Sequence, residues 1–232
     1  MGRASRARAA ARHSRPTAAQ PLLRSPLPED QKTLARLLDM VIPGDPGTAG
    51  FAVQLATIPI PAARAGHYAS GSAWVAEEQG TAVGLLVAAP PLAWIDSVPA
   101  LQHDRRLLLS RRMAECEYMA VDPASRGHKL GALMTQHARH QFTARGVRLM
   151  TGTVTEDRFG LLPYYRSMGW KTLRPGEALG ILEPAQPVAV WRPSEPHVVQ
   201  MWLPLHRDVA VINWPTPDGI RPVINGVLPL PR

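Results

Sequence analysis

The sequence predicts a mixed α/β domain, and three segments carry that prediction. Residues 29–42 repeat apolar side chains at the i, i+3, i+4, i+7, i+8 spacing of an amphipathic helix. Residues 73–87 form two β-rich runs on either side of a turn that contains Gly80, which is typical of a hairpin. Residues 114–145 begin as an apolar strand, cross a Pro/Ser turn and continue with helical periodicity. Strands interleaved with helices in this way build layered α/β domains.

The remaining elements follow from apolar runs and their stop signals. Pro43-Gly44, Gly146 and Gly169 each end a predicted helix. In chain order we expect a short strand at 22–24, helices at 29–42 and 51–57, the hairpin, a basic amphipathic helix with a solvated basic face inside an insertion at 90–113, a strand at 114–121, a helix at 127–145, a strand at 147–154, a short helix at 159–167, and strands at 178–182 and 198–203. Residues 206–232 are punctuated by proline and are expected to wrap the surface as an extension.

The net charge of +8 is unevenly distributed along the 232 residues. Six arginines and no acidic residue occur within residues 1–28, so the rest of the chain carries only +2 (8 − 6). A nearly neutral body argues against nucleic-acid binding other than through the first 20 residues. Those residues are rich in Arg, Ala and Ser and are expected to be a disordered tail: a polyanion-binding arm, a transit peptide or a functionless extension.

Composition also limits the compartment and the kind of site. No apolar run has the roughly 18 to 20 residues of a membrane span, and no secretory apolar region is found near the N-terminus. The single cysteine, Cys116, excludes an internal disulfide framework. We therefore expect a cytoplasmic protein without a membrane partner. His137 and His140 have no carboxylate or cysteine to complete a metal site, so no metal is expected.

The segment from Val121 to Met134 is the most informative part of the chain. Val121-Asp122-Pro123 ends a strand, and a basic loop with Arg126, Gly127 and Lys129 then opens a helix. The N-terminus of a helix offers free backbone N–H groups and a positive dipole, which suit a diphosphate. Glycine lets the backbone approach the phosphate oxygens closely.

This segment resembles the acyl-CoA-binding motif of the GNAT superfamily of N-acyltransferases, R/Q-x-x-G-x-G/A after a strand that ends in V-x-P. Arg126 and Gly131 match its outer positions, and Lys129 replaces the middle glycine. The segment 162–170, LPYYRSMGW, resembles the family's F/L-Y-x-x-x-G-F, and Arg24 with Asp30 resembles its opening I-R-x-x-x-x-x-D. The three matches occur in the family's order, and the resemblance extends over residues 21–205.

The resemblance implies the GNAT fold: a mixed, mostly antiparallel central sheet flanked by helices and splayed at the acyl-CoA site. It also implies acetyl-CoA as the acyl-donor cosubstrate and transfer of the acetyl group to a primary amine by direct attack. The implied contacts run from the strand end to the start of the helix: Met119, Ala120 and Val121 with the pantetheine arm, and Arg126, Gly127, His128, Lys129, Leu130, Gly131 and Ala132 with the diphosphate.

The same resemblance suggests two catalytic residues. Tyr165 matches the tyrosine that protonates the departing sulfur, and Glu115 falls near a general-base glutamate of some members. Glu117 shares a strand face with Glu115 and is favoured as a plain hydrogen-bond partner, whereas Cys116 and Tyr164 are expected in the core.

Two departures from the family pattern leave the function open. Lys129 replaces a glycine, and Asp157-Arg158 stand where an asparagine often binds the cofactor. The leading hypothesis is an N-acetyltransferase acting on a small amine, with a peptide N-terminus as the competing acceptor and residues 90–113 as a lid. The alternative is a non-catalytic GNAT-fold protein that senses acyl-CoA or associates with nucleic acid. A homodimer through residues 198–203 and the C-terminal extension is a further possibility.

Overall fold

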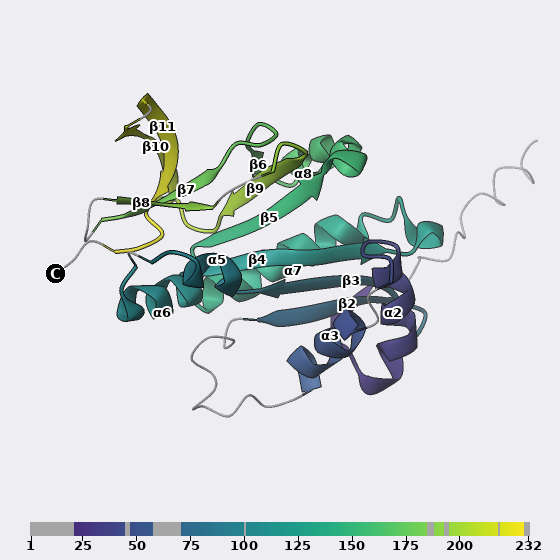
Figure 1. Ribbon diagram of the computed structural model, residues 1–232. Coiled ribbons are helices and arrows are strands. Elements are labelled where there is room, and N and C mark those ends of the chain that lie inside the picture. Colours follow the sequence, from purple (N-terminus) through teal and green to yellow (C-terminus); the bar gives the residue numbers. More distant parts are fainter. Residues whose placement is uncertain are drawn as a thin grey trace, which may run out of the picture.

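The computed structural model describes residues 21–44, 47–57, 71–99, 101–184, 188–192, 195–217 and 219–229. The predicted tail at 1–20 lies outside these residues, as do residues 45–46 and 58–70. Two sheets make up the described structure (Figure 1). The larger has the order β1-β2-β3-β4-β5-β9-β6 and contains β1 (Leu22–Arg24), β2 (Ser72–Glu78), β3 (Thr81–Ala89), β4 (Met113–Val121), β5 (Leu149–Thr155), β6 (Lys171–Thr172) and β9 (Val198–Pro204).

The helices lie mainly between the strands of this sheet in sequence. They are the 3₁₀ turn η2 (Pro28–Asp30), α2 (Gln31–Asp39), α3 (Gly47–Thr57), α5 (Leu92–Asp96), α6 (His103–Arg112), η3 (Pro123–Ser125), α7 (Leu130–Ala144), η4 (Glu156–Leu161) and α8 (Leu162–Ser167). This order agrees with the predicted mixed α/β domain, and the mostly antiparallel sheet is confirmed: among the described strands of the larger sheet, only β4 and β5 pair in parallel.

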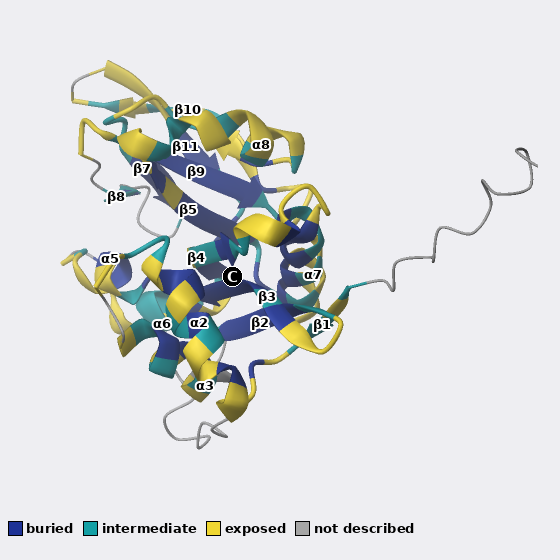
Figure 2. Cartoon of the chain, turned by 90° about the vertical axis from the view of Figure 1, so that its right-hand side faces the viewer, coloured by how far each residue is buried: buried dark blue, intermediate teal, exposed yellow. Residues whose placement is uncertain are grey.

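Helices cover both faces of the larger sheet. Alternate residues of a strand point to opposite faces, so Val75 and Leu85 pack with Leu34 of α2, whereas Trp74 and Leu86 pack with Phe142 of α7. The central strands are correspondingly buried in Figure 2. At the N-terminal edge, the Arg24 guanidinium contacts the carboxylates of both Asp30 and Glu77 at 2.5 Å. This ion-pair cluster joins β1, η2 and β2, and it gives a structural role to the Arg24/Asp30 pattern.

The sheet opens between β4 and β5. The two strands pair only at Met113, Ala114 and Glu115, and they separate beyond that point (Figure 1). On its other edge, β4 pairs with β3 through to Val121, with a bulge that leaves Glu117 without a partner residue. A bulge bends and twists its strand. The predicted splay is therefore present, and a bulged carboxylate residue stands at its start.

The prediction for residues 206–232 was wrong. They form the hairpin of β10 (Ala210–Thr216) and β11 (Gly219–Asn225), which joins β7 (Leu179–Glu183) and β8 (Val188–Arg192) in a second sheet of order β10-β11-β7-β8. Pro215 and Pro222 led to the wrong prediction, because proline donates no ladder hydrogen bond and is tolerated mainly at sheet edges and irregularities. The hairpin covers β7, where Ile224 lies beside Ile181, so residues on both sides of position 205 share one sheet.

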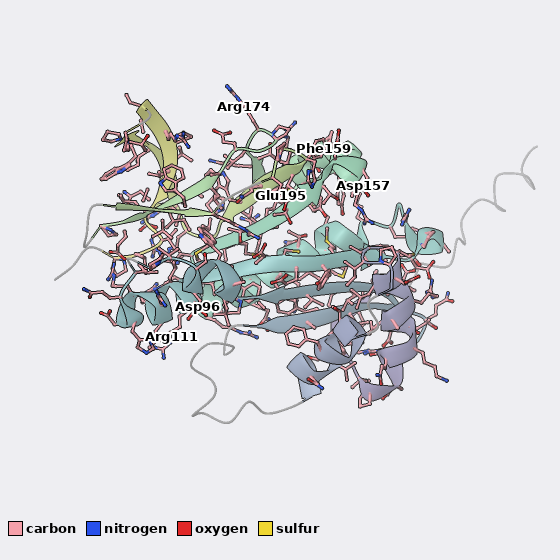
Figure 3. The ribbon with its side chains drawn as sticks, in the orientation of Figure 1. Asp96, Arg111, Asp157, Phe159, Arg174 and Glu195 are labelled. Atoms are coloured by element: carbon pink, nitrogen blue, oxygen red, sulfur yellow. The ribbon has the colours of Figure 1, made fainter. Side chains whose placement is uncertain are left out.

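The insertion at 90–113 contains α5 and the predicted basic helix, α6. Its basic face is not simply solvated as expected. Arg105 forms an ion pair with the fully buried Glu183 of β7, with Nη2 2.6 Å from Oε1, and Arg106 donates to two carbonyl groups of the preceding loop. Arg111 does point outward (Figure 3). The insertion is thus anchored to the second sheet.

No helix in the described part of the chain is both long and apolar enough to cross a lipid bilayer.

Candidate functional site

A cavity of about 870 Å³ lies between the end of β4 and the start of α7, and we call it the β4–α7 cavity. The loop from β4 to α7 forms one wall, and η4 and α8 form the other. Most residues expected to contact the cofactor line it: Met119, Ala120, Val121, Arg126, Gly127, Lys129, Leu130 and Gly131. The sequence motif therefore folds into one concave surface.

Local hydrogen bonds shape the loop before α7. The Asp122 carboxylate accepts from the Ala124 backbone N–H and forms an ion pair with Arg36 of α2. Gly127 has a φ of +89° and Lys129 has a φ of +62°. Lys129 thus keeps the left-handed backbone that the glycine of the family motif would adopt readily, and its exposed side chain extends from the N-cap of α7.

Lys129→Gly is expected to raise the free energy of unfolding by about 1 kcal/mol, because a left-handed conformation is costly for a residue with a Cβ. The same change is expected to weaken acetyl-CoA binding, because it removes a cation beside the cavity. Denaturant unfolding and calorimetric titration measure the two effects. Gln79→Gly is the matched control, since Gln79 has a φ of +53° and does not line the cavity. It should stabilise the fold and leave acetyl-CoA affinity unchanged; tighter binding by Lys129→Gly would contradict the role given to the lysine.

Two of the predicted contact residues do not line the cavity. His128 turns to Glu78, with Nδ1 3.1 Å from Oε1, and is held on the side of the β2–β3 hairpin. The backbone N–H of Ala132 donates to the hydroxyl of Tyr164. Both residues remain near the N-terminus of α7, but the structure gives their polar groups protein partners.

Tyr164 is not a core residue, contrary to the expectation. Its side chain is 38% exposed and lines the cavity above the first turn of α7. A Cβ at position 131 would lie 2.3 Å from its hydroxyl oxygen, so glycine is the residue that fits there. The hydroxyl accepts a hydrogen bond at the helix N-terminus, in the position where an anion would do the same.

Arg158 bridges the open end of the site. Its Nη2 donates to the carbonyl oxygens of Met40 and Val41, at 3.0 and 3.3 Å, and so joins η4 to the C-terminal end of α2. The neighbouring Asp157, visible at the η4 end of the molecule in Figure 3, accepts from the Thr155 hydroxyl. Where the family often has an asparagine, this chain therefore has an arginine whose guanidinium connects two walls of the cavity.

A second cavity, of about 470 Å³, lies in the gap between β4 and β5, and we call it the β4–β5 cavity. It shares five lining residues with the β4–α7 cavity, so the two meet: Val41, Met119, Arg158, Leu161 and Tyr165. Apolar side chains of the insertion form its far wall, and the carboxylates of β4 lie along its floor. The predicted lid segment thus lines this cavity through Pro91, Leu92, Ala93 and Trp94.

The two carboxylates of β4 have different partners. Glu115 is buried and forms an ion pair with Arg192 of β8, with 2.6 Å between Oε1 and Nη1. Glu117 has no hydrogen bond or ion pair within the described residues, and its side chain is accessible from the cavity. Desolvation by the surrounding walls and the nearby charge of Glu115 raise the pKa of Glu117 to about 7, against the opposing effect of Arg192. Glu117 therefore changes its protonation state near neutral pH.

Tyr165 stands where the cavities join. It packs edge-on against Trp170, with ring centroids 6.2 Å apart, and its hydroxyl has no hydrogen-bond partner in the part of the chain that the structure describes. Burial raises the pKa of Tyr165 well above its usual value, so the hydroxyl stays protonated. Burial likewise raises the pKa of the Cys116 thiol to about 12, which leaves it uncharged and unsuited to nucleophilic attack.

Sequence reasoning missed Arg192 and Trp94, and it undervalued Glu117. Arg192 belongs to a strand that was not predicted, and Trp94 belongs to the insertion. The carboxylate of Glu117 is free because of the bulge in β4, and no sequence pattern predicts that bulge. A signal did exist in the pair of glutamates separated by one residue on a predicted strand.

The comparisons agree with this geometry. Residues 50–170, more than half of the chain, match the model of the Acetyltransferase (GNAT) family. No curated protein is similar enough in sequence to match the chain. Among solved structures, the chain is similar to a putative phosphinothricin N-acetyltransferase (15% identity, TM-score 0.51, covering 81% of this chain and 99% of that one).

Two further similar structures contain acetyl-CoA. One is a phosphinothricin acetyltransferase from Sinorhizobium meliloti, at 13% identity and a TM-score of 0.51, covering 79% of this chain and 88% of that one. The other is the putative acetyltransferase yncA from Salmonella typhimurium, at 12% identity and a TM-score of 0.54, covering 83% and 98%. At such identities the likeness supports the fold alone. With the family match, the splayed sheet and the glycine-bearing loop, it follows that the chain belongs to the GNAT family of acetyltransferases.

Proposed function

We propose that the protein transfers the acetyl group of acetyl-CoA to the primary amine of a small molecule. One observation carries this proposal: two cavities meet at Tyr165, one lined by the GNAT loop and the other by an unpaired carboxylate. The first suits a cosubstrate with a diphosphate, and the second suits an amine. The two similar structures that contain acetyl-CoA support this choice of cosubstrate.

The residues of the β4–α7 cavity fit acetyl-CoA. Beyond Glu115, the edge of β4 that faces β5 has no partner strand in the described structure, so its backbone groups can pair with the pantetheine arm. Gly131 leaves the helix N-terminus open to a diphosphate, provided that Tyr164 moves aside. Arg126 and Lys129 add positive charge there. Acetyl-CoA supplies an activated thioester.

The β4–β5 cavity supplies the base. A primary amine enters as an ammonium ion, and the Glu117 carboxylate takes the proton that must leave before nitrogen can attack. The nitrogen then forms a bond to the acetyl carbon as the carbon–sulfur bond breaks. Tyr165 gives its proton to the departing sulfur and regains one from the nitrogen. The products are an amide and CoA thiol, and one proton is released in total.

Glu117, rather than the expected Glu115, is our candidate for this base. Glu115 is committed to Arg192, whereas Glu117 is accessible and titrates near neutral pH. A base is most effective when its pKa lies near the working pH. Glu115 then serves to position the guanidinium of Arg192.

The proposal is tested by mixing purified protein, acetyl-CoA and a panel of primary amines, and by measuring released thiol together with the acetylated product. Amine-dependent release with stoichiometric amide is expected. Acetyl-CoA binding without acetylation of any small amine or peptide N-terminus would overturn the proposal and leave a non-catalytic binding protein.

Tyr165→Phe is expected to lower kcat by about 10- to 100-fold, near the lower end of what a general acid contributes, because a thiol with a pKa of about 8.5 already leaves fairly readily. The aromatic packing against Trp170 is kept, so the midpoint of thermal unfolding should change little. Tyr164→Phe is the neighbouring control and should retain kcat. An unchanged kcat in Tyr165→Phe would remove the tyrosine from the chemistry.

A further inference from the structure

The β4–β5 cavity contains more unpaired polar groups than an amine alone requires. Glu117 and the Tyr165 hydroxyl are accounted for above. The Arg192 guanidinium also lines this cavity, and among the described residues its only side-chain polar contact joins one nitrogen, Nη1, to Glu115. Its Nε and Nη2 groups have no hydrogen-bond acceptor there. An arginine placed in a cavity wall with free donors is suited to an oxyanion.

The protein holds Arg192 in place from two sides. Glu115 contacts Nη1 at 2.6 Å, and the guanidinium lies over the ring of Trp94 at 5.8 Å from its centroid. Trp94 comes from the insertion and Arg192 from β8, so two segments outside the strands of the larger sheet position this one group. The ring restricts the guanidinium without consuming a donor. The indole Nε1 of Trp94 is itself buried without a hydrogen-bond partner in the described structure.

Charge in the cavity favours the same interpretation. The Glu115 and Arg192 charges offset each other, and Glu117 adds a negative charge when it is ionised. Arg192 is close enough to Glu117 to lower its pKa, although the net shift is upward. A zwitterionic ligand complements such a pair: its ammonium group faces Glu117 and its carboxylate faces the free edge of Arg192. Much of the remaining wall is apolar, with Ile42, Leu92 and Leu161 among its residues, but it also includes the hydroxyl groups of Thr153 and Thr155. The Arg158 guanidinium at the junction with the β4–α7 cavity adds a second positive charge.

From this arrangement we infer that the acceptor is an amino acid, which is a small primary amine with a carboxylate and an apolar side chain. Its carboxylate would bind to Arg192. The inference rests on the proposed function and goes beyond it by naming the substrate class. A peptide N-terminus has an amide where an amino acid has its carboxylate, so it offers Arg192 no charge.

The test uses leucine, methionine and phenylalanine, each beside its primary amide and beside the amine that lacks the carboxyl group. For the wild-type protein, kcat/KM is expected to be about 100-fold higher for the amino acid than for either analogue, within the range that a hydrogen bond to a charged group contributes. Each compound is also titrated by calorimetry into the protein saturated with CoA, which reports binding without turnover.

Arg192 is tested together with Glu115, because removing the arginine alone would leave the Glu115 carboxylate buried without a partner. The double variant Arg192→Met, Glu115→Gln removes both charges at similar volume, and its thermal midpoint verifies folding. It should bring the preference for the amino acid down to about equality, mainly through loss of amino acid turnover. Arg111→Met, which removes an exposed arginine of α6, should retain the full preference.

The outcomes separate the inference from the proposed function. If amides and simple amines are acetylated as well as amino acids, the acceptor assignment is wrong and the enzyme assignment stands. If no compound is acetylated but amino acids still bind the CoA complex through Arg192, the assignment of the ligand stands and catalysis falls. If wild-type and double variant show the same preference in both measurements, Arg192 does not read the carboxylate.

Discussion

Gly131→Asp is expected to reduce the affinity for acetyl-CoA by about 1000-fold, since two negative charges about 4 Å apart near a protein surface repel by about 4 kcal/mol. The substituted side chain would start in space that Tyr164 already occupies and would extend toward the diphosphate position at the N-terminus of α7. Calorimetric titration with acetyl-CoA measures the loss. The charge, rather than the extra volume, is the main cause.

A pair of control variants separates charge from volume. Gly131→Ala adds only the Cβ that meets the Tyr164 hydroxyl at 2.3 Å, and it should weaken binding much less, because that hydroxyl is the end of a movable side chain. Combining Gly131→Ala with Tyr164→Ala should restore the affinity for acetyl-CoA that Gly131→Ala alone loses. If Gly131→Asp bound acetyl-CoA as tightly as the wild type, the diphosphate would have to lie elsewhere.

Glu117→Gln is expected to lower kcat/KM for the amine by about 100- to 10,000-fold, the range that general-base catalysis contributes. Its pH dependence is the sharper readout. The carboxylate form is the base, so in the wild type log kcat/KM should rise with unit slope below pH 7 and level off above the Glu117 pKa of about 7. The variant should lose this inflection. Glu115→Gln is the matched control: it should keep an inflection, moved to lower pH because the charge of Glu115 helps to raise the pKa of Glu117.

The same raised pKa has a consequence for stability. Between the ordinary carboxyl pKa and about 7, the folded protein holds a proton on Glu117 that the unfolded chain has lost, so stability falls as the pH rises through this window. Glu117→Gln removes this loss of stability at higher pH. The variant should therefore be more stable than the wild type at pH 8, and the difference should vanish at pH 4. Lower stability of the variant at pH 8 would mean that the carboxylate has a partner in the fold.

Much of the cofactor side follows from sequence because it depends on local backbone chemistry. Positive φ at Gly127, a helix that begins at Leu130 and a cradle at Gly131 all lie within one short segment, where spacing reports structure directly. The acceptor side could not be predicted in this way. Glu115, Trp94 and Arg192 come together from β4, the insertion and β8, and nothing local to any of them indicates the other two.

The choice between Glu115 and Glu117 shows the same limit on a finer scale. Strand alternation places both carboxylates on one face, and it cannot say which one is neutralised. That depends on Arg192, which is far away in sequence, and on a bulge that releases Glu117 from pairing with β3. The prolines of β10 and β11 had a comparable effect, because a local rule about strand breakers concealed a long-range pairing with β7.

The two proposed substrate sites are built on different parts of the fold, because the second sheet contributes to only one of them. The cosubstrate loop is built on the family segment, whereas Arg192 belongs to β8, which pairs with β7, and β7 in turn is paired with the C-terminal hairpin and held by Arg105. Substitutions in that hairpin can accordingly accumulate without disturbing the loop that we propose to bind the diphosphate of acetyl-CoA. If the acceptor binds where we propose, acceptor specificity can change while binding of acetyl-CoA is preserved. Substitutions in the C-terminal hairpin are then expected to alter which amine the enzyme acetylates.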